Sequence, residues 1–190
     1  MEKIPEIYEV ARGLFVKLEE VIKKTIEITN YSEFEENILN EFNNYVEAVL
    51  YIVAVSDNSF QDVELQFVEN ITGKPSILAG YNKEKISDLT SDQTKLLFDK
   101  IKCILSSVPS FIKISIEADK KIESYGKVLN PSYTQLIYDR LKRLASYIKL
   151  VDGQIVGEED KASKEALSTI VKYFKSKRIA YAPKEHIEED

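Results

Sequence analysis

Two short acidic segments each contain several carboxylates that could together bind a cation. Their members are carboxylates only: Asp57, Asp62 and Glu64 in the first segment, and Asp152, Glu158 and Glu159 in the second. Oxygen ligands of this kind suit Ca²⁺ or Mg²⁺, whereas firm Zn²⁺ binding needs thiolates or imidazoles. Because few ligands are in place, water would complete the coordination shell. The sequence therefore predicts, at most, a weak site for Ca²⁺ or Mg²⁺.

Neither segment has the pattern of an EF-hand calcium loop. Such a loop supplies oxygen ligands at alternating positions and a glutamate at the twelfth position. Counted from Asp57 the twelfth residue is Val68, and counted from Asp152 it is Ser163. A cation bound here would need a different arrangement of ligands.

The two segments are related by an internal repeat. Asp57 and Asp152 are separated by 95 residues, and so are Glu64 and Glu159. Each acidic segment follows an apolar helical pattern and precedes an amphipathic one. This order is typical of a repeated helix-loop-helix unit. The same carboxylates also fit turns that bind nothing, since an aspartate can accept backbone N–H bonds and a glutamate is favoured in the first turn of a helix. Both interpretations remain open.

Apolar residues recur every three or four positions along most of the chain, as in helices with one buried face. The longest stretches of this kind cover residues 7–26, 34–52 and 136–151, and shorter ones cover 63–71, 96–104 and 166–174. Residues 111–116 alternate with period two and could form a strand. Helical spacing continues beyond them to Tyr125, with Pro109 before and Gly126 after, so we favour a helix there.

Three pairs of residues predict where helices begin. Ser32 with Glu35 and Thr90 with Gln93 have the spacing of a capping box, and Asn130 followed by Pro131 resembles a cap before a proline in the first turn. The sequence thus predicts an all-α fold in one compact domain.

Composition and charge exclude several classes of function. The formal net charge is −6, which gives no overall attraction to the phosphates of nucleic acid or to anionic lipid, so we expect no nucleic-acid partner. Cys103 is the only cysteine, so no disulfide can form within the chain. The longest apolar run, 48–55, is too short to span a bilayer, and the N-terminus lacks the features of a secretory signal. We expect a cytoplasmic protein.

The residues needed for common catalytic centres are scarce. His186 is the only histidine and lies in a C-terminal segment that has lost helical periodicity. Cys103 lies between Ile101 and Ile104, and we expect it to be a small buried apolar residue. The chain has neither a P-loop nor a GxGxxG motif. We therefore predict no enzymatic activity, although an enzyme that uses carboxylates alone remains an alternative.

The second acidic segment resembles the loop of a known family. The order of an apolar helix, V-D-G-Q-I-V-G-E-E and an amphipathic helix is similar to TerB, the tellurite-resistance family, and to the related N-terminal domain of certain membrane-anchored DnaJ-like cochaperones. Asp152, Gly153, Ile155 and Glu159 match the D-G-x-hydrophobic-S-x-x-E loop of these proteins. The first copy keeps the pattern at Asp57, Phe60 and Glu64. The serine of the pattern is replaced in both copies, by Gln61 and Val156.

The resemblance implies a single helical domain with pseudo-twofold symmetry. Residues 1–175 would form this TerB-like domain, with the two copies at about 34–73 and 132–175, and residues 176–190 would be a flexible tail. It also implies a non-enzymatic protein that acts with protein partners in a bacterial stress-response or defence assembly. The alternative from the residues themselves is a divalent-cation-binding protein that uses the acidic inter-helix loops.

Overall fold

All regular secondary structure in the described part of the chain is helical, which confirms the predicted all-α fold. The computed structural model describes residues 4–56, 62–72, 89–148, 150–151 and 157–179, and these contain no strand. Residues 111–116, where a strand was the alternative, lie within a helix. In chain order the elements are α1 (Ile4–Thr29), the 3₁₀ turn η1 (Ser32–Phe34), α2 (Glu35–Ala54), α3 (Asp62–Thr72), α4 (Ser91–Ser106), α5 (Ser110–Ser124), α6 (Tyr133–Ile148), α7 (Gly157–Ala166) and α8 (Ser168–Lys177).

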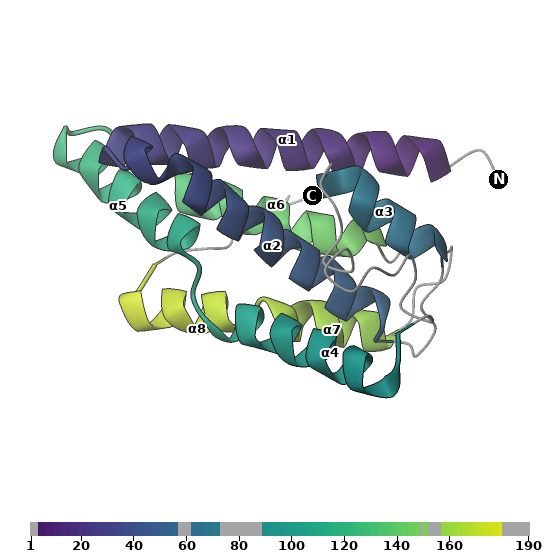
Figure 1. Cartoon of the computed structure of the whole chain (residues 1–190). Helices are drawn as coiled ribbons and strands as arrows, with labels where there is room; N and C mark the ends of the chain where they lie inside the picture. The colour runs from purple at the N-terminus through teal and green to yellow at the C-terminus, as the bar shows by residue number, and fades with distance from the viewer. Residues whose placement is uncertain (1–3, 57–61, 73–88, 149, 152–156, 180–190) are drawn as a thin grey trace, which may run out of the picture.

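Helix α1 lies along one side of the molecule (Figure 1) and packs mainly against α5, α6 and α3. Its buried face includes Leu18, Ile22 and Ile26. Side chains from other helices also donate hydrogen bonds to carbonyl oxygens of α1: the Arg140 guanidinium bonds Lys17 O at 2.6 Å and the Lys121 ammonium bonds Ile28 O at 2.6 Å. These polar contacts hold the amphipathic helix against α5 and α6.

Helix α2 runs through the middle of the bundle (Figure 1) and contacts α3, α4, α5, α6 and α7. It is therefore buried on more than one face. An aromatic cluster anchors its first half: the ring of Phe42 stacks on Phe15 at 5.2 Å and meets Phe111 edge to face at 5.5 Å, and Tyr45 contacts the same Phe111 ring at 5.7 Å. Aromatic pairs of this geometry add to the stabilisation that burial of apolar area provides.

One predicted helix start is confirmed and two are wrong. Thr90 and Gln93 form the predicted capping box at α4. Ser32 does not cap α2, because it lies inside the turn η1, and α2 begins after Phe34 without a side-chain cap. Helix α6 begins two residues later than Asn130-Pro131 predicts, and that peptide bond is cis.

The start of α6 is held by a capping box one residue beyond Pro131, whose spacing is present in the sequence, and by a carboxylate from another helix. Ser132 and Gln135 bond each other's backbone N–H groups, at 2.9 Å and 3.3 Å. In addition, Asp119 of α5 accepts the backbone N–H groups of Tyr133 and Thr134 at 2.8 Å and 3.0 Å. A carboxylate at this end of a helix also interacts favourably with the helix dipole. The distant Asp119 thus supplies part of the cap.

The prediction that Cys103 is buried is wrong, since its side chain is exposed. Helix α4 buries Leu97, Ile101 and Leu105, which follow one another at four-residue spacing. Cys103 lies two residues from Ile101 and Leu105, so it points to the opposite side of the helix. Other apolar residues of the predicted stripes are exposed near helix ends or on outer faces, namely Val10, Phe34, Leu96 and Tyr125.

One pair of helix starts agrees with the repeat offset and one does not, since α2 and α6 begin 98 residues apart, at residues 35 and 133. A superposition of the two copies stays a prediction. Helix α3 begins at residue 62 and α7 at residue 157, and these positions are again 95 residues apart. The second copy differs in that its last helix is divided at Leu167 into α7 and α8. Helix α8 ends at Lys177, inside the segment predicted as a tail, and residues 180–190 lie outside the described part of the chain.

No helix within the described residues is long and apolar enough to cross a membrane.

Candidate functional site

The structure does not describe the side chains of most of the predicted cation ligands. Asp57 and Asp152 belong to segments that are not described, and for Asp62, Glu158 and Glu159 the backbone is described but not the side chain. The first turns of α3 and α7 contain the carboxylates that the sequence places there. The predicted cation site therefore stays a prediction.

Glu64 is the one predicted ligand whose side chain is described. It is the third residue of α3, as Glu159 is the third residue of α7, and it is only 1% exposed. A carboxylate is rarely buried to this degree unless it is paired. Among the described residues no group of three or more histidine, cysteine, aspartate or glutamate side chains is arranged to hold a metal ion.

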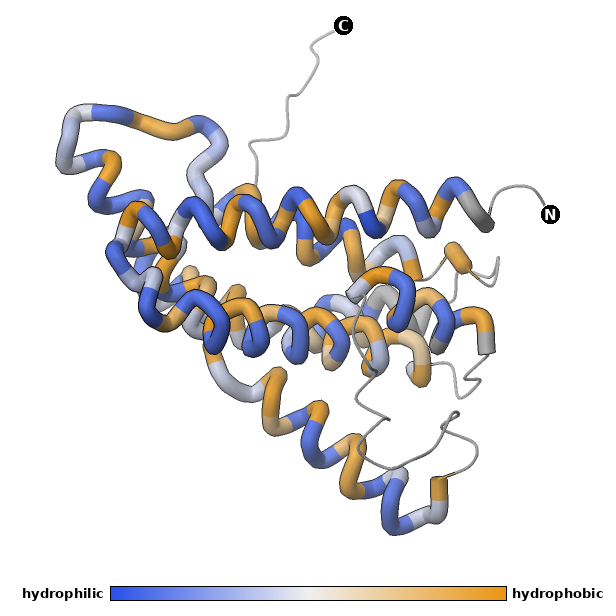
Figure 2. Tube along the Cα trace, turned by 45° about the horizontal axis from the view of Figure 1, so that its top comes forward, coloured by the Kyte–Doolittle hydropathy of each residue, from blue (hydrophilic) through white to orange (hydrophobic). Residues whose placement is uncertain are grey.

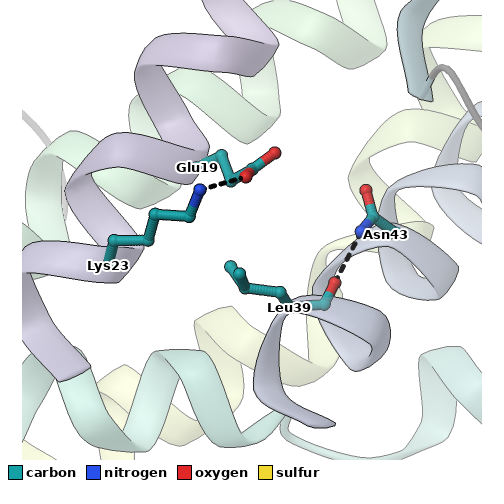
Figure 3. A network of polar contacts seen from close by, with 4 residues as sticks. All are labelled: Glu19, Lys23, Leu39 and Asn43. Carbon is teal, nitrogen blue, oxygen red and sulfur yellow. Dashed lines mark hydrogen bonds and ion pairs between the residues drawn. The ribbon is translucent and has the colours of Figure 1, made fainter. Parts of the chain in front are cut away.

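Helix α2 also buries polar residues that the sequence analysis does not single out. Glu47 is buried and accepts a hydrogen bond from the hydroxyl of Thr72, at the end of α3, at 3.1 Å. Asn43 lies one turn earlier and donates to the carbonyl oxygen of Leu39 at 2.7 Å, while its own side-chain oxygen lacks a hydrogen-bond partner among the described residues. Figure 3 shows this oxygen pointing away from Leu39. The bond between Glu47 and Thr72 thus joins α2 to α3, whereas the bond of Asn43 stays within α2.

A concave surface lies between α2 and α5. We call it the α2–α5 groove. The α5 wall is one stripe of the helix with spacing i, i+3, i+4, i+7, namely Ser110, Lys113, Ile114 and Glu117. The other wall consists of Asn37, Ile38 and Glu41 of α2, preceded by Tyr31 and Phe34 at η1. Such a stripe is about 10 Å long, or two helical turns. The groove has a volume of about 570 Å³.

The floor of the groove is apolar and its rim is polar. Ile38 and Ile114 are buried at the floor, where the two helices approach each other. Lys113 and Glu117 are exposed at the rim, and Glu41 is half-buried. An apolar floor with a few polar groups around it is the common composition of a site for a small ligand or a peptide side chain.

An exposed aromatic pair forms one end of the groove. Tyr31 and Phe34 lie in and next to η1 with their ring centroids 6.4 Å apart, and both side chains are more than a third exposed. Large apolar side chains that remain in water beside a groove are common at sites where a partner binds. This pair is therefore the most exposed apolar part of the groove lining.

Glu41 is held in place by the start of α5. Its Oε2 atom accepts the backbone N–H of Ser110 at 2.8 Å, and the residue at the cap position, Pro109, provides no side-chain cap. The carboxylate thus satisfies one of the N–H groups that a helix start leaves unpaired. Its position is fixed before any ligand arrives.

The sequence indicates part of the groove only indirectly. It assigns Phe34, Ile38 and Ile114 to apolar stripes, but it cannot tell that Phe34 stays exposed. Glu41 and Glu117 look like ordinary polar positions of amphipathic helices. Only the contact between two helices that are distant in sequence gives them a common site, and no local signal predicts that contact.

A comparison with known proteins adds no relative. No protein-family model matches the chain, and no curated protein and no solved structure matches it. The similarity to TerB is therefore supported by the acidic loops of the sequence alone.

Proposed function

We propose that this chain is a non-enzymatic interaction module that binds a short, basic and apolar segment of a partner protein in the α2–α5 groove. The observation that supports the proposal is the pairing of two helix stripes around a buried apolar floor, with Tyr31 and Phe34 exposed at one end. A bulky apolar side chain of the partner would lie over Ile38 and Ile114. Binding in a groove between helices through a few apolar anchors is a recurrent mode of peptide recognition.

The charge around the groove favours a basic partner. Glu41 and Glu117 line it against the single cation of the lining, Lys113. Glu33 and Glu36 lie close by in the first turns of η1 and α2. Lysine or arginine beside the apolar anchor would pair with these carboxylates, whereas an acidic segment would be repelled.

Selection of peptides from a random displayed library would test the proposal directly. We expect the selected peptides to combine a large apolar residue with lysine or arginine. The chain contains no tryptophan, so a selected peptide labelled with tryptophan would report binding through fluorescence without background from the protein. Truncation of an anchor in such an interface typically reduces affinity by about ten-fold or more, and we expect this for Phe34→Ala.

Leu96→Ala provides the matched control. Leu96 is also a large exposed apolar residue, but it lies on α4, away from the groove lining. Its variant should bind the selected peptides as the parent does. Peptides that are mainly acidic, or that bind the Phe34→Ala variant as tightly as the parent, would contradict the proposed groove.

The acidic loops support a proposal about the biological setting. Because Asp152, Gly153, Ile155 and Glu159 resemble the TerB loop, we place the partner in a cytoplasmic stress-response or defence assembly of a bacterium. Deletion of the gene should then reduce survival under tellurite or under phage challenge, and the Phe34→Ala variant should fail to restore it. Full restoration by this variant would show that the stress phenotype does not depend on the α2–α5 groove.

A divalent-cation-binding protein is the second candidate. The observation that favours it is the equivalent position of Glu64 and Glu159, each the third residue of a helix that follows an acidic segment. Calorimetric titration with Ca²⁺ and Mg²⁺ would test it on the parent and on a double Asp57→Ala, Asp152→Ala variant. Heat and a rise in melting temperature at millimolar cation, both lost in the variant, would support the site. Absence of both effects in the parent would remove it.

A further inference from the structure

The connection between α5 and α6 carries apolar residues into solvent. The exposed fractions are 70% for Tyr125, 84% for Val128 and 36% for Leu129. Figure 2 shows that this connection projects beyond the neighbouring helices and contains a hydrophobic stretch. Gly126 begins it with a φ of 73°, which lets the chain turn away from the end of α5. We call residues 125–129 the α5–α6 tip.

A basic pocket adjoins the tip. It has a volume of about 360 Å³, and Leu129 of the tip is part of its lining. The cations of the lining are Lys120 of α5 and Lys177 and Arg178 at the end of α8. Lys127 adds a further cation in the tip itself. Projecting apolar side chains and a group of cations thus occur together at one end of the molecule.

The acidic residues of this pocket do not cancel its charge. Asp119 and Glu123 also belong to the lining, so its three cations exceed its two carboxylates by one, and Lys127 of the tip adds a further positive charge. The whole chain has a net charge of −6, so a local excess of lysine and arginine contrasts with the remaining surface. Near a negatively charged surface the molecule would therefore turn this end toward that surface.

From this combination we propose that the α5–α6 tip and the basic pocket dock on an anionic lipid bilayer. Val128 and Leu129 would enter the boundary between head groups and acyl chains, Tyr125 would lie at head-group level, and the cations would contact lipid phosphates. The surface is a projecting loop, so it suits a deformable lipid interface. This contact is separate from the α2–α5 groove and does not depend on it.

The expected contact is weak and sensitive to salt. A single myristoyl chain gives an association constant of only about 10⁴ M⁻¹ with membranes, and three side chains bury less apolar area than such a chain. The electrostatic part falls as salt shortens the range of the field. The chain would therefore bind reversibly to the anionic leaflet.

Co-sedimentation with vesicles tests the proposal. One vesicle preparation contains phosphatidylcholine alone, and the other contains about 30% phosphatidylglycerol to provide a negative surface potential. We expect the full chain to sediment with the anionic vesicles at low ionic strength, to remain in solution with the neutral vesicles, and to be released by about 0.5 M salt. A parent chain that stays in solution with the anionic vesicles would overturn the proposal.

Two variants with matched controls locate the contact. Val128→Asp should reduce the bound fraction at least about ten-fold, because it replaces an inserted side chain by a charge. Lys120→Glu should reduce it by about five-fold or more, as expected for the loss of one surface cation. Leu96→Asp and Lys102→Glu make the same chemical changes on the exposed face of α4 and should bind like the parent. Thermal melts confirm that all four variants are folded.

Three other outcomes would overturn the membrane contact, and two of them would point to a different ligand. Undiminished vesicle binding by Val128→Asp would overturn the insertion of the tip. A rise in melting temperature with inorganic phosphate, without any binding to vesicles, would assign the basic pocket to a free anion and overturn the membrane contact. Binding to an acidic polypeptide such as polyglutamate, again without vesicle binding, would assign the tip to a protein.

Discussion

Helices α2 and α6 occupy the same place in the two halves of the chain but have different surroundings. At the offset of 95 residues, Val49 corresponds to Leu144, and both are buried. Ala48 and Tyr51, in contrast, are buried in α2, whereas the equivalent Arg143 and Ser146 are exposed in α6. Residues at this offset thus share one buried face, although the helix starts themselves, at residues 35 and 133, are 98 positions apart. The neighbouring helices determine whether a second face is covered as well.

The largest expected effect comes from giving α2 the surface residue of α6. Ala48→Arg would place a charge and a long side chain in a fully buried position, and we expect destabilisation of more than about 4 kcal/mol. The reverse test, Arg143→Ala, should change stability by no more than about 0.5 kcal/mol, because the Arg143 side chain is largely in water and its ion pair with Asp139 is at the surface. Circular dichroism melts measure both. Equal melting temperatures would contradict the central position of α2.

An intermediate effect is expected where α2 buries a polar group that α6 leaves in water. Thr72→Val removes the hydroxyl that donates to Glu47 and should cost about 1–3 kcal/mol, as the loss of a partner to a buried acceptor does. Lys142 is the exposed counterpart of Glu47, and Lys142→Gln should be nearly neutral. Urea unfolding of both variants measures the difference. A Thr72→Val variant as stable as the parent would show that this hydrogen bond is dispensable.

The starts of α2 and α6 give a smaller contrast. Asp119→Ala removes the carboxylate that accepts two N–H groups at α6 and should cost about 1–2 kcal/mol. Ser32→Ala should have an effect below about 0.5 kcal/mol, since Ser32 does not cap α2. Chemical denaturation distinguishes the two variants. A larger cost for Ser32 than for Asp119 would reverse our assignment of the caps.

The smallest effect at neutral pH is expected for Tyr45→Phe. The hydroxyl of Tyr45 bonds the Ala166 carbonyl oxygen at 3.4 Å, which is long, so its loss should cost about 0.5 kcal/mol. Alkaline pH should reveal more. Burial, and to a smaller extent the neighbouring Tyr138, raises the pKa of Tyr45 above its ordinary value.

The sign of the pH effect follows from the raised pKa. Above about pH 10 the unfolded chain loses the Tyr45 proton and the folded chain keeps it, so the free energy of unfolding falls as pH rises, by at most about 1.4 kcal/mol per pH unit. Tyr45→Phe removes this contribution and should make the loss of stability above pH 10 less steep. Melting temperatures between about pH 9 and pH 11.5 test this. Identical slopes for parent and variant would contradict the burial of this hydroxyl.

The sequence predicts the helices well because their periodicity is a local property. The stripe through Ile38, Phe42 and Tyr45 is buried as expected, and the box at Thr90 and Gln93 is formed. Errors occur where tertiary contacts decide the outcome. Asp119 caps a helix from another helix, and Cys103 turns outward because Leu97, Ile101 and Leu105 take the buried face.

The candidate sites were less predictable than the fold for the same reason. The apolar floor of the α2–α5 groove could be found from periodicity, but its acidic rim depends on which helices become neighbours. The exposed tip at Val128 has no pattern that distinguishes it from other apolar residues. The acidic loops, in contrast, have a sequence pattern, although only Glu64 among their predicted ligands has a described side chain.

The packing of α1 also bears on how the chain folds during synthesis. The bond between Arg140 and Lys17 O joins residues that are 123 positions apart, and α6 covers much of the apolar face of α1. At a translation rate of about 5–20 residues per second, this face would wait roughly 6–25 s for its partner to be made. The emerging N-terminal helix would thus be a binding site for ribosome-associated chaperones until α6 leaves the exit tunnel.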